Sequence, residues 1–252
     1  MRESPRSEHY SYTVYREPQT VSSFDEKRFG GPIGEIVAAT QAHVITNFIG
    51  RVQGRRILDV GTGTGRAALL LAGGGGIVTA VDASEEMLDE ARARAEARSV
   101  AVAFQVGDAH ALKFSDRSFD VVVSLRVLMH TPGWKQALGE MCRVADQLVI
   151  VDYPSRFSFA WLQSGARAAM VRLGVRTEAY RVFSRSEIAR ELAAHGYRIR
   201  STHRLFVLPI ALHKTIGSRP FTTWIEQRLD DLGLLRLFGS PVTLVAERCA
   251  YS

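Results

Sequence analysis

The chain has few cysteines and no long apolar run, and these absences exclude several classes of protein. Only two of its 252 residues are cysteines, Cys142 and Cys249, and they lack the close spacing of metal ligands. No run of about 18 uninterrupted apolar residues is present, so no transmembrane helix is expected. The first residues, Met1-Arg-Glu-Ser-Pro, lack the apolar core of a signal peptide. We therefore expect a cytoplasmic protein with buried or inert thiols and no metal centre.

Signatures of nucleic-acid binding are missing as well. There is no zinc finger, no RNA-recognition signature and no long basic run. The net charge of +6 is uneven, since residues 1–150 hold 17 basic and 18 acidic side chains and residues 151–252 hold 15 and 8. A basic C-terminal part could attract an anionic membrane surface or an acidic substrate. Solvated arginines explain the excess equally well, so we expect no nucleic-acid partner and leave a peripheral membrane contact open.

Strands and helices are predicted to alternate through most of the chain. Helical spacing or helix caps occur between apolar runs and on both sides of them. They predict helices at residues 134–144, 157–173, 184–195 (capped by Ser184 or Ser186) and 220–238, among others. Seven runs are expected to be strands: residues 56–60, 77–82, 100–106, 119–125, 147–153, 197–207 and 241–247. Near-continuous apolar runs such as 121–123 and 148–151 fit strands that are buried on both faces. The pattern predicts an α/β fold with a doubly wound, mostly parallel seven-stranded sheet.

A glycine-rich turn follows the first strand. It reads Asp59-Val-Gly61-Thr-Gly63-Thr-Gly65, a GxGxG arrangement that differs from the GxGxxG of dinucleotide-binding proteins. Glycines allow close backbone approach, and the helix N-terminus that follows offers free amides. A carboxylate at Asp59 would repel a pyrophosphate but suits a ligand with an ammonium group and a sulfonium. The alternative is that Asp59 only holds the amides of the loop.

Two further acids lie at the ends of the next strands. Asp82 ends the second strand, at the position where an acid can bond a ribose diol. Asp108 ends the third strand, within reach of an adenine amino group. Each alone could be a helix cap or a turn residue. Three acids at successive strand ends, on the edge where such sheets bind ligands, favour a ligand site.

Residues 56–152 resemble the class I S-adenosylmethionine-dependent methyltransferases, in the group similar to the ubiquinone/menaquinone-biosynthesis enzymes. The resemblance rests on a series of motifs in order along the chain: Ile57-Leu-Asp-Val-Gly-Thr-Gly-Thr-Gly-Arg, Val81-Asp-Ala-Ser-Glu-Glu-Met-Leu, Gly107-Asp-Ala, Ser118-Phe-Asp-Val-Val-Val-Ser and Leu128-Met-His. One departure is that Ala145-Asp-Gln replaces the Lys-Pro-Gly-Gly turn that often precedes the fifth strand.

This resemblance implies a Rossmann-like fold and S-adenosyl-L-methionine as the cofactor. It places Asp59, Gly61 and Gly63 by the methionine part and Asp82 by the ribose. It places Met87 on the adenine, although a core position for this residue is an equal alternative. The remaining residues of the expected cofactor site are Thr62, Gly65, Ala83, Asp108, Ala109 and Ser124.

The residues expected to contact the methyl acceptor follow the fourth and fifth strands. His130 is the leading general base, because the pKa of a histidine suits proton removal from a hydroxyl or an amine; it could equally cap the loop before Pro132. Arg126 could orient an anionic acceptor or lie in solvent, and Tyr153 is a further residue for substrate binding. Asp152 is another candidate, and His213 is a weaker one.

Segments outside the motif-bearing region are expected to cover the site. Residues 1–55 are predicted to form an arm and a helix over the cofactor, where Phe24-Asp-Glu-Lys-Arg-Phe29 resembles the covering arm of the family. Residues 56–252 form the predicted methyltransferase domain, with cap insertions near 155–180 and 208–240 that could accept a lipophilic substrate or only cover the sheet. The expected function is in-line methyl transfer to a small molecule, which could be lipophilic. The alternative is a non-catalytic adenosylmethionine-binding module or partner subunit.

Overall fold

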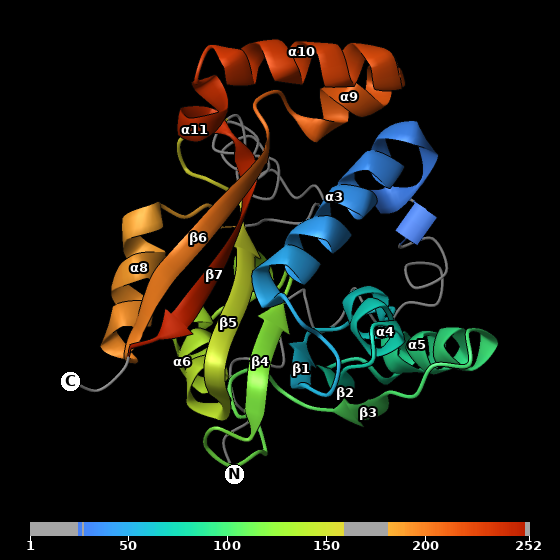
Figure 1. The fold of residues 1–252 in the computed structure, drawn as a ribbon, viewed down its shortest axis with the longest axis vertical. Helices are drawn as coiled ribbons and strands as arrows, with labels where there is room; N and C mark the ends of the chain where they lie inside the picture. Colours follow the sequence, from blue (N-terminus) through green and yellow to red (C-terminus); the bar gives the residue numbers. More distant parts are fainter. Residues whose placement is uncertain (1–24, 27, 159–180, 250–252) are drawn as a thin grey trace, which may run out of the picture.

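A computed structural model describes residues 25, 26, 28–158 and 181–249, which form one seven-stranded sheet with helices on both faces (Figure 1). The strand order is β3-β2-β1-β4-β5-β7-β6. The strands are β1 (Arg56–Val60), β2 (Ile77–Asp82), β3 (Ala103–Val106), β4 (Phe119–Ser124), β5 (Ala145–Tyr153), β6 (Tyr197–Phe206) and β7 (Ser240–Arg248). The first five pair in parallel, and β7 runs antiparallel between β5 and β6. The prediction of a mostly parallel, doubly wound sheet is confirmed.

Alternate residues of β5 show how the two faces of the sheet are filled. Val149 and Val151 belong to a buried cluster with α6 (Trp134–Val144) and α8 (Arg185–Ala194). Leu148 and Ile150 belong to a second cluster with α3 (Gly31–Ile49) and α4 (Arg66–Gly73). Because successive side chains of a strand point to opposite faces, a strand between two helical layers must be apolar at every position. The continuous apolar runs of the sequence therefore lie in the centre of the sheet.

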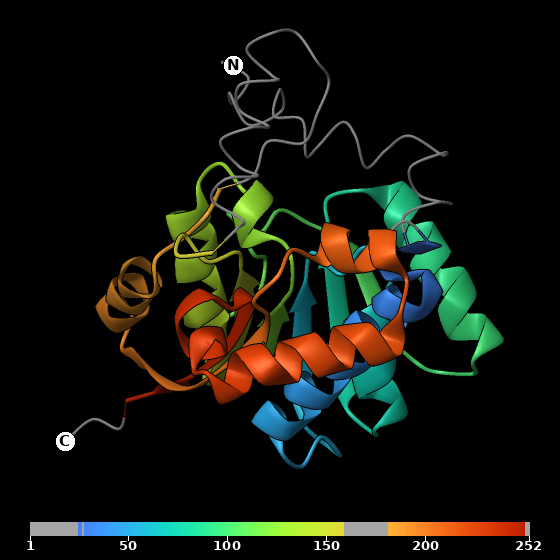
Figure 2. The same cartoon turned by 90° about the horizontal axis from the view of Figure 1, so that it is seen from above.

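The remaining helices lie at one edge and one end of the sheet. The helix α5 (Glu85–Ala97) packs along β2 and β3. Three helices, α9 (Ile210–Ile216), α10 (Arg219–Asp231) and α11 (Leu234–Phe238), lie together at the end of the molecule to which β4 and β5 point (Figures 1 and 2). We call residues 208–239 the cap. It belongs to the connection between β6 and β7, where the sequence predicted an insertion.

Several predicted boundaries differ from the structure. The single helix expected at residues 220–238 is two helices, because Gly233 adopts a left-handed conformation with φ 74° between α10 and α11. The third strand begins at Ala103 and not at residue 100. The segment Ala145-Asp-Gln lies inside β5, so the departure from the family pattern lengthens a strand. The predicted helical segment 157–173 lies mostly outside the described residues.

The chemistry of the two thiols differs. Cys142 is buried, and burial raises the pKa of its thiol to about 12, so it is inert as expected. Cys249 is exposed. Within the described ranges, no helix is both long and apolar enough to cross a bilayer. The same residues contain no group of three or more histidine, cysteine, aspartate or glutamate side chains that could hold a metal ion.

Candidate ligand-binding site

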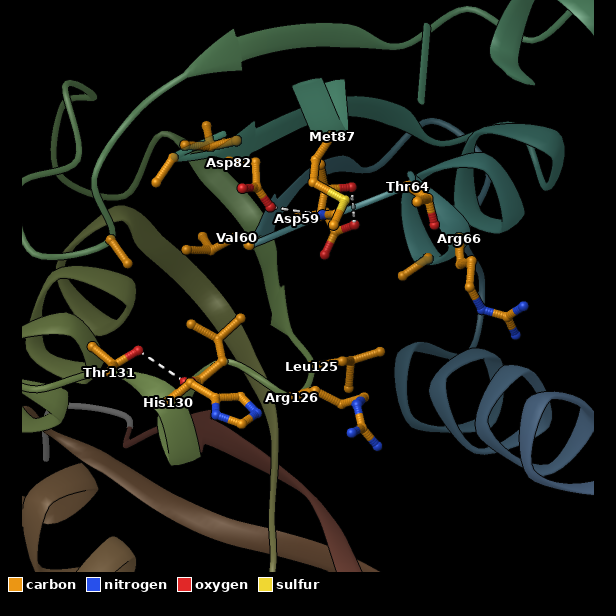
Figure 3. A pocket seen from close by; sticks show the side chains of 18 of the residues that line it. Asp59, Val60, Thr64, Arg66, Asp82, Met87, Leu125, Arg126, His130 and Thr131 are labelled. Carbon is orange, nitrogen blue, oxygen red and sulfur yellow. Dashed lines mark hydrogen bonds between the residues drawn. The ribbon is translucent and has the colours of Figure 1, made fainter. Parts of the chain in front are cut away.

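A pocket of about 1100 Å³, part of it open to solvent, lies at the carboxyl ends of β1, β2 and β4 (Figure 3). Ten residues predicted from the sequence line it: Asp59, Gly61, Thr62, Gly63, Asp82, Ala83, Met87, Ala109, Arg126 and His130. Lining residues that the sequence reasoning did not identify include Gln41, Thr64, Arg66, Ala67, Leu125, Val127 and Thr131.

The turn after β1 is shaped by glycine conformation and by close contact. Gly61 has φ 71°, and its amide donates to the carbonyl of Val81 at 2.7 Å. A Cβ added at Gly61 would lie 2.2 Å from Cγ2 of Val127, which is far closer than any real contact. Only glycine fits a left-handed position against another side chain in this way. The turn therefore packs directly on the segment that follows β4.

Asp59 holds the turn and also reaches the pocket. Its Oδ2 accepts hydrogen bonds from the Thr62 hydroxyl at 2.7 Å and from the Ala68 amide at 3.1 Å. The side chain is 2% exposed, and burial raises the pKa of its carboxyl to about 6, although these bonds offset part of the effect. The charge of Asp82 raises the same pKa further. Both predicted roles of Asp59 are thus compatible with its position.

Asp82 at the end of β2 organises the neighbouring amides. Its Oδ2 accepts from the Gly63 amide at 2.7 Å, and its Oδ1 accepts from the Ser84 amide at 3.0 Å. Burial raises the pKa of this carboxyl, and the amide bonds lower it. Ser84 in turn caps α5, because its hydroxyl accepts from the Met87 amide. Met87 is buried yet lines the pocket, so a core role and a ligand-binding role both describe it.

The N-terminal segment forms one side of the pocket. Both carboxylate oxygens of Asp25 lie 3.1 Å from the Thr64 hydroxyl, and Asp25 also pairs with Arg94 of α5. The guanidinium of Arg66 lies 3.7 Å from the ring centroid of Phe29. Arg28 and Phe29 both line the pocket. The described part of the covering arm predicted at Phe24–Phe29 therefore lies on the pocket wall.

The opposite end of the pocket is formed by residues 125–131 after β4 (Figure 3). Arg126 has φ 61°, and its backbone amide donates to Oδ1 of Asp152 at the end of β5. Asp152 is 3% exposed, and burial raises the pKa of its carboxyl to about 6. His130 ends the short helix η2 (Leu128–His130), and its side chain is buried at the pocket wall. The sequence-predicted pair Arg126 and His130 is therefore brought together at one end of the pocket.

Four residues of the predicted cofactor and substrate sites do not line the pocket, and neither do the further candidates Asp152 and His213. Gly65 caps α4 with φ 81° and faces α5, where a Cβ added to it would lie 3.0 Å from the Cβ of Ala91. The Asp108 carboxylate accepts from both the backbone amide and the Nδ1 of His110. The Ser124 hydroxyl donates to the carbonyl of Val60.

Tyr153, the fourth of these residues, is buried on the face that carries α6 and α8. Its ring packs edge-on against Phe183 at 6.1 Å between centroids. His213, the weaker base candidate, is enclosed in the cap between Thr222 and Glu226, with its Nε2 2.8 Å from the Glu226 carboxylate. These hydrogen bonds join α9 to α10, so His213 has a structural role in the cap. Nothing in the spacing of residues along the sequence indicated this role.

Part of the chain is similar to a known protein family. Residues 57–147 match the family described as methyltransferase domain. A demethylmenaquinone methyltransferase of Thermus thermophilus is 40% identical over 105 residues, which are 40% of this chain and 48% of the relative. The chain thus spans about half the length of the curated relatives it matches. The resemblance to class I methyltransferases that the motifs predicted is confirmed.

Solved structures extend the likeness to nearly the whole chain. The magnesium protoporphyrin IX methyltransferase of Synechocystis, solved with bound SAH, is 19% identical with a TM-score of 0.66, over 94% of this chain and 99% of that one. The cyclase SpnF is 19% identical with a TM-score of 0.59, over 84% of this chain and 81% of that one. At these identities the likeness shows the fold, and the two names together show that this fold serves more than one reaction.

Proposed function

We propose that this chain, which has the fold of class I methyltransferases and matches the methyltransferase domain over residues 57–147, binds S-adenosylmethionine in the pocket and transfers its methyl group to a small molecule. One observation carries the proposal. Asp59 is buried and Asp82 is half-buried at the carboxyl ends of the paired strands β1 and β2, where the charge of Asp82 raises the pKa of Asp59. A ligand with a positive charge relieves this repulsion and favours both ionised forms. Adenosylmethionine has two such charges, an ammonium and a sulfonium, whereas a pyrophosphate would add to the repulsion.

Each half of the cofactor has residues suited to it. The Asp82 carboxylate already accepts two amide bonds and keeps lone pairs for the hydroxyls of a ribose. Met87, Ala83 and Ala109 offer apolar surface for the adenine at the same end. The first turn of α4, where Arg66 and Ala67 line the pocket, suits the carboxylate of the methionine part. Arg28 and Phe29 would cover the cofactor and exclude water, as expected of the N-terminal arm.

The acceptor would bind between the cofactor and residues 125–131. When bound, adenosylmethionine supplies an electrophilic methyl carbon; the acceptor atom bonds to this carbon while the carbon–sulfur bond breaks and the sulfur keeps the electron pair. Two residues of this chain then act on the acceptor: His130 takes its proton, and Arg126 orients it. Both side chains lie at the acceptor end in Figure 3.

The exposed apolar side chains of the cap favour a lipophilic acceptor and a peripheral membrane contact. Seven large apolar side chains are exposed there: Leu212, Ile216, Phe221, Trp224, Leu232, Leu237 and Phe238. Exposed apolar side chains concentrated in one region of a protein are typical of sites that contact lipid or another molecule. The double substitution Trp224→Ser, Leu232→Ser should abolish sedimentation with phosphatidylglycerol vesicles. Ile77→Ser, which removes a side chain that is 63% exposed outside the cap, should leave sedimentation unchanged. Equal sedimentation of all three proteins would contradict the contact.

Two measurements test the proposed function. Calorimetry with S-adenosylhomocysteine should give saturable binding, and incubation of the protein with adenosylmethionine and fractionated metabolite extracts should release adenosylhomocysteine. Binding without turnover in any fraction would favour the alternative of a binding module. Absence of binding by properly folded protein would refute the site.

A further inference from the structure

We propose that the methyl acceptor carries an ionised acidic group, such as a carboxylate, which Arg126 binds, and that Asp152 is the positioning residue that holds Arg126 on the pocket wall. This inference rests on the proposed function, because it assigns the part of the pocket that the cofactor leaves. It names a chemical class of acceptor: an apolar molecule with a single anionic end.

Charge is separated along the pocket. Among the described lining residues, the only carboxylates are Asp59 and Asp82, and both lie at the end assigned to the cofactor. The other end has Arg126 on its wall. Two more arginines line the side of the pocket: Arg28 of the N-terminal segment, and Arg66 of α4, whose guanidinium packs on Phe29. An anion is attracted to the end that holds cations and repelled from the end that holds the two acids.

Lys214 of the cap adds a further cation to this region. The Nζ of Lys214 donates to the backbone carbonyl of Arg28 at 2.9 Å, which joins α9 of the cap to the N-terminal segment. Burial lowers the pKa of Lys214, and the charge of Arg126 lowers it further, so the positive potential of Arg126 extends to this ammonium.

The backbone of Arg126 has an uncommon conformation. Among the described residues other than glycine, only Ser99, Arg117 and Arg126 have a positive φ. The first two lie in turns at element ends, outside the pocket wall, whereas Arg126 lies on it. This conformation is unfavourable for an arginine, and such residues cluster at ligand sites where the surroundings impose them.

The group that imposes this conformation is Asp152. Its buried carboxylate accepts the backbone amide of Arg126, and it comes from the neighbouring strand β5. This bond to the backbone fixes the point from which the Arg126 side chain extends, on the stretch of pocket wall where His130 also lies (Figure 3). An anion on Arg126 would therefore set the rest of the acceptor between the base and the methyl donor.

The experiment compares a charged and a neutral probe of equal shape. The protein is first saturated with S-adenosylhomocysteine, whose affinity is measured, and is then titrated with 1-naphthoate or with 1-naphthamide in a calorimeter. Naphthoate should bind about tenfold more tightly than naphthamide, as expected for a charge-assisted bond to arginine. Arg126→Gln should remove this preference and leave the affinity for adenosylhomocysteine within about twofold.

Matched variants separate the roles. Arg117→Gln, an exposed arginine with φ 53° outside the pocket, should leave the preference intact. Asp152→Ala should weaken naphthoate binding about fivefold or more, and Asp152→Asn, which keeps an oxygen acceptor for the amide, should restore much of it. Equal affinity for the two probes, a preference that survives Arg126→Gln, or no naphthoate binding at about 5 mM would each overturn the inference. If adenosylhomocysteine itself does not bind, the proposed function fails first, and the calorimetry distinguishes the two failures.

Discussion

The contact between Gly61 and Val127 allows a quantitative test of how the glycine turn is built. Replacing Gly61 by alanine adds two separate costs. The first is the left-handed backbone at φ 71°, which for a residue with a Cβ costs about 1–2 kcal/mol. The second is overlap with the Val127 methyl, since the added Cβ would lie 2.2 Å from it, and overpacking of this kind costs about 1–3 kcal/mol. Gly61→Ala should therefore reduce the free energy of unfolding by about 2–5 kcal/mol.

Three further variants separate these costs. Gly54 has φ 76° and nothing within 4 Å of a Cβ position, so Gly54→Ala measures the backbone cost alone, about 1–2 kcal/mol. Val127→Ala removes the side chain that the new Cβ would meet. In the double variant Gly61→Ala, Val127→Ala the overlap disappears, so the two changes should show a favourable coupling of about 1–3 kcal/mol.

The assay is urea unfolding followed by circular dichroism, analysed by linear extrapolation for all four variants. The same proteins titrated with S-adenosylhomocysteine would show whether the displaced segment after β4 also weakens the ligand site. If Gly61→Ala cost no more than Gly54→Ala and showed no coupling to Val127→Ala, the close packing of the turn on this segment would be refuted.

Three other tests address the site and the cap. Asp82→Ala and Gly63→Asp should each weaken binding of adenosylmethionine tenfold or more, about 1.4 kcal/mol, in calorimetry; unchanged affinity in folded variants would contradict the assignment. Asp152 has a folded-state pKa of about 6 against 3.8 in the unfolded chain, so the native state holds its proton more tightly and stability should fall as pH rises from about 4 to 6. In urea unfolding between pH 4 and 6, Asp152→Asn should reduce this loss of unfolding free energy by up to about 3 kcal/mol. Parallel plots of unfolding free energy against pH for the variant and the unchanged protein would contradict the raised pKa of Asp152. Glu226→Ala should destabilise the protein by about 2–3 kcal/mol, because it removes the acceptor for His213 and for two backbone amides, while affinity for adenosylhomocysteine stays unchanged. A loss below about 0.5 kcal/mol would show that this buried network does not hold the cap.

The elements that local rules control were predictable from the sequence. The Ser184 capping box begins α8 at Arg185, and the apolar helix at 134–144 has the predicted bounds, because caps and 3.6-residue spacing act within a few residues. Gly233 shows where local rules stop. The apolar pattern continues through Gly233 from α10 to α11, but the left-handed backbone of Gly233 ends the helical segment before it. Glycine can adopt either a helical or a left-handed conformation, so tertiary packing decides whether the helix continues.

The ligand end of the pocket was also readable from the sequence. Asp59, Gly61, Gly63 and Asp82 follow strands whose carboxyl ends meet at one edge of a parallel sheet, so adjacency in space follows from order in the chain. The same logic did not extend to every strand end. Asp108 follows β3 but does not line the pocket, because its carboxylate accepts hydrogen bonds from the backbone amide and the Nδ1 of His110, two residues further along the chain.

By itself, the sequence determined the order of elements along the chain: which segments are strands, which are helices, and which glycine turn lies at the strand ends that line the pocket. Periodicity, caps and glycine spacing are local, so they can be recognised without knowledge of the fold. Tertiary structure alone decided that Gln41 of α3 and Val127 after β4 face the same pocket, and that Asp152 holds the backbone of Arg126. These contacts join residues far apart in the chain, and no local pattern encodes them, because they depend on how two helical layers and a sheet pack together.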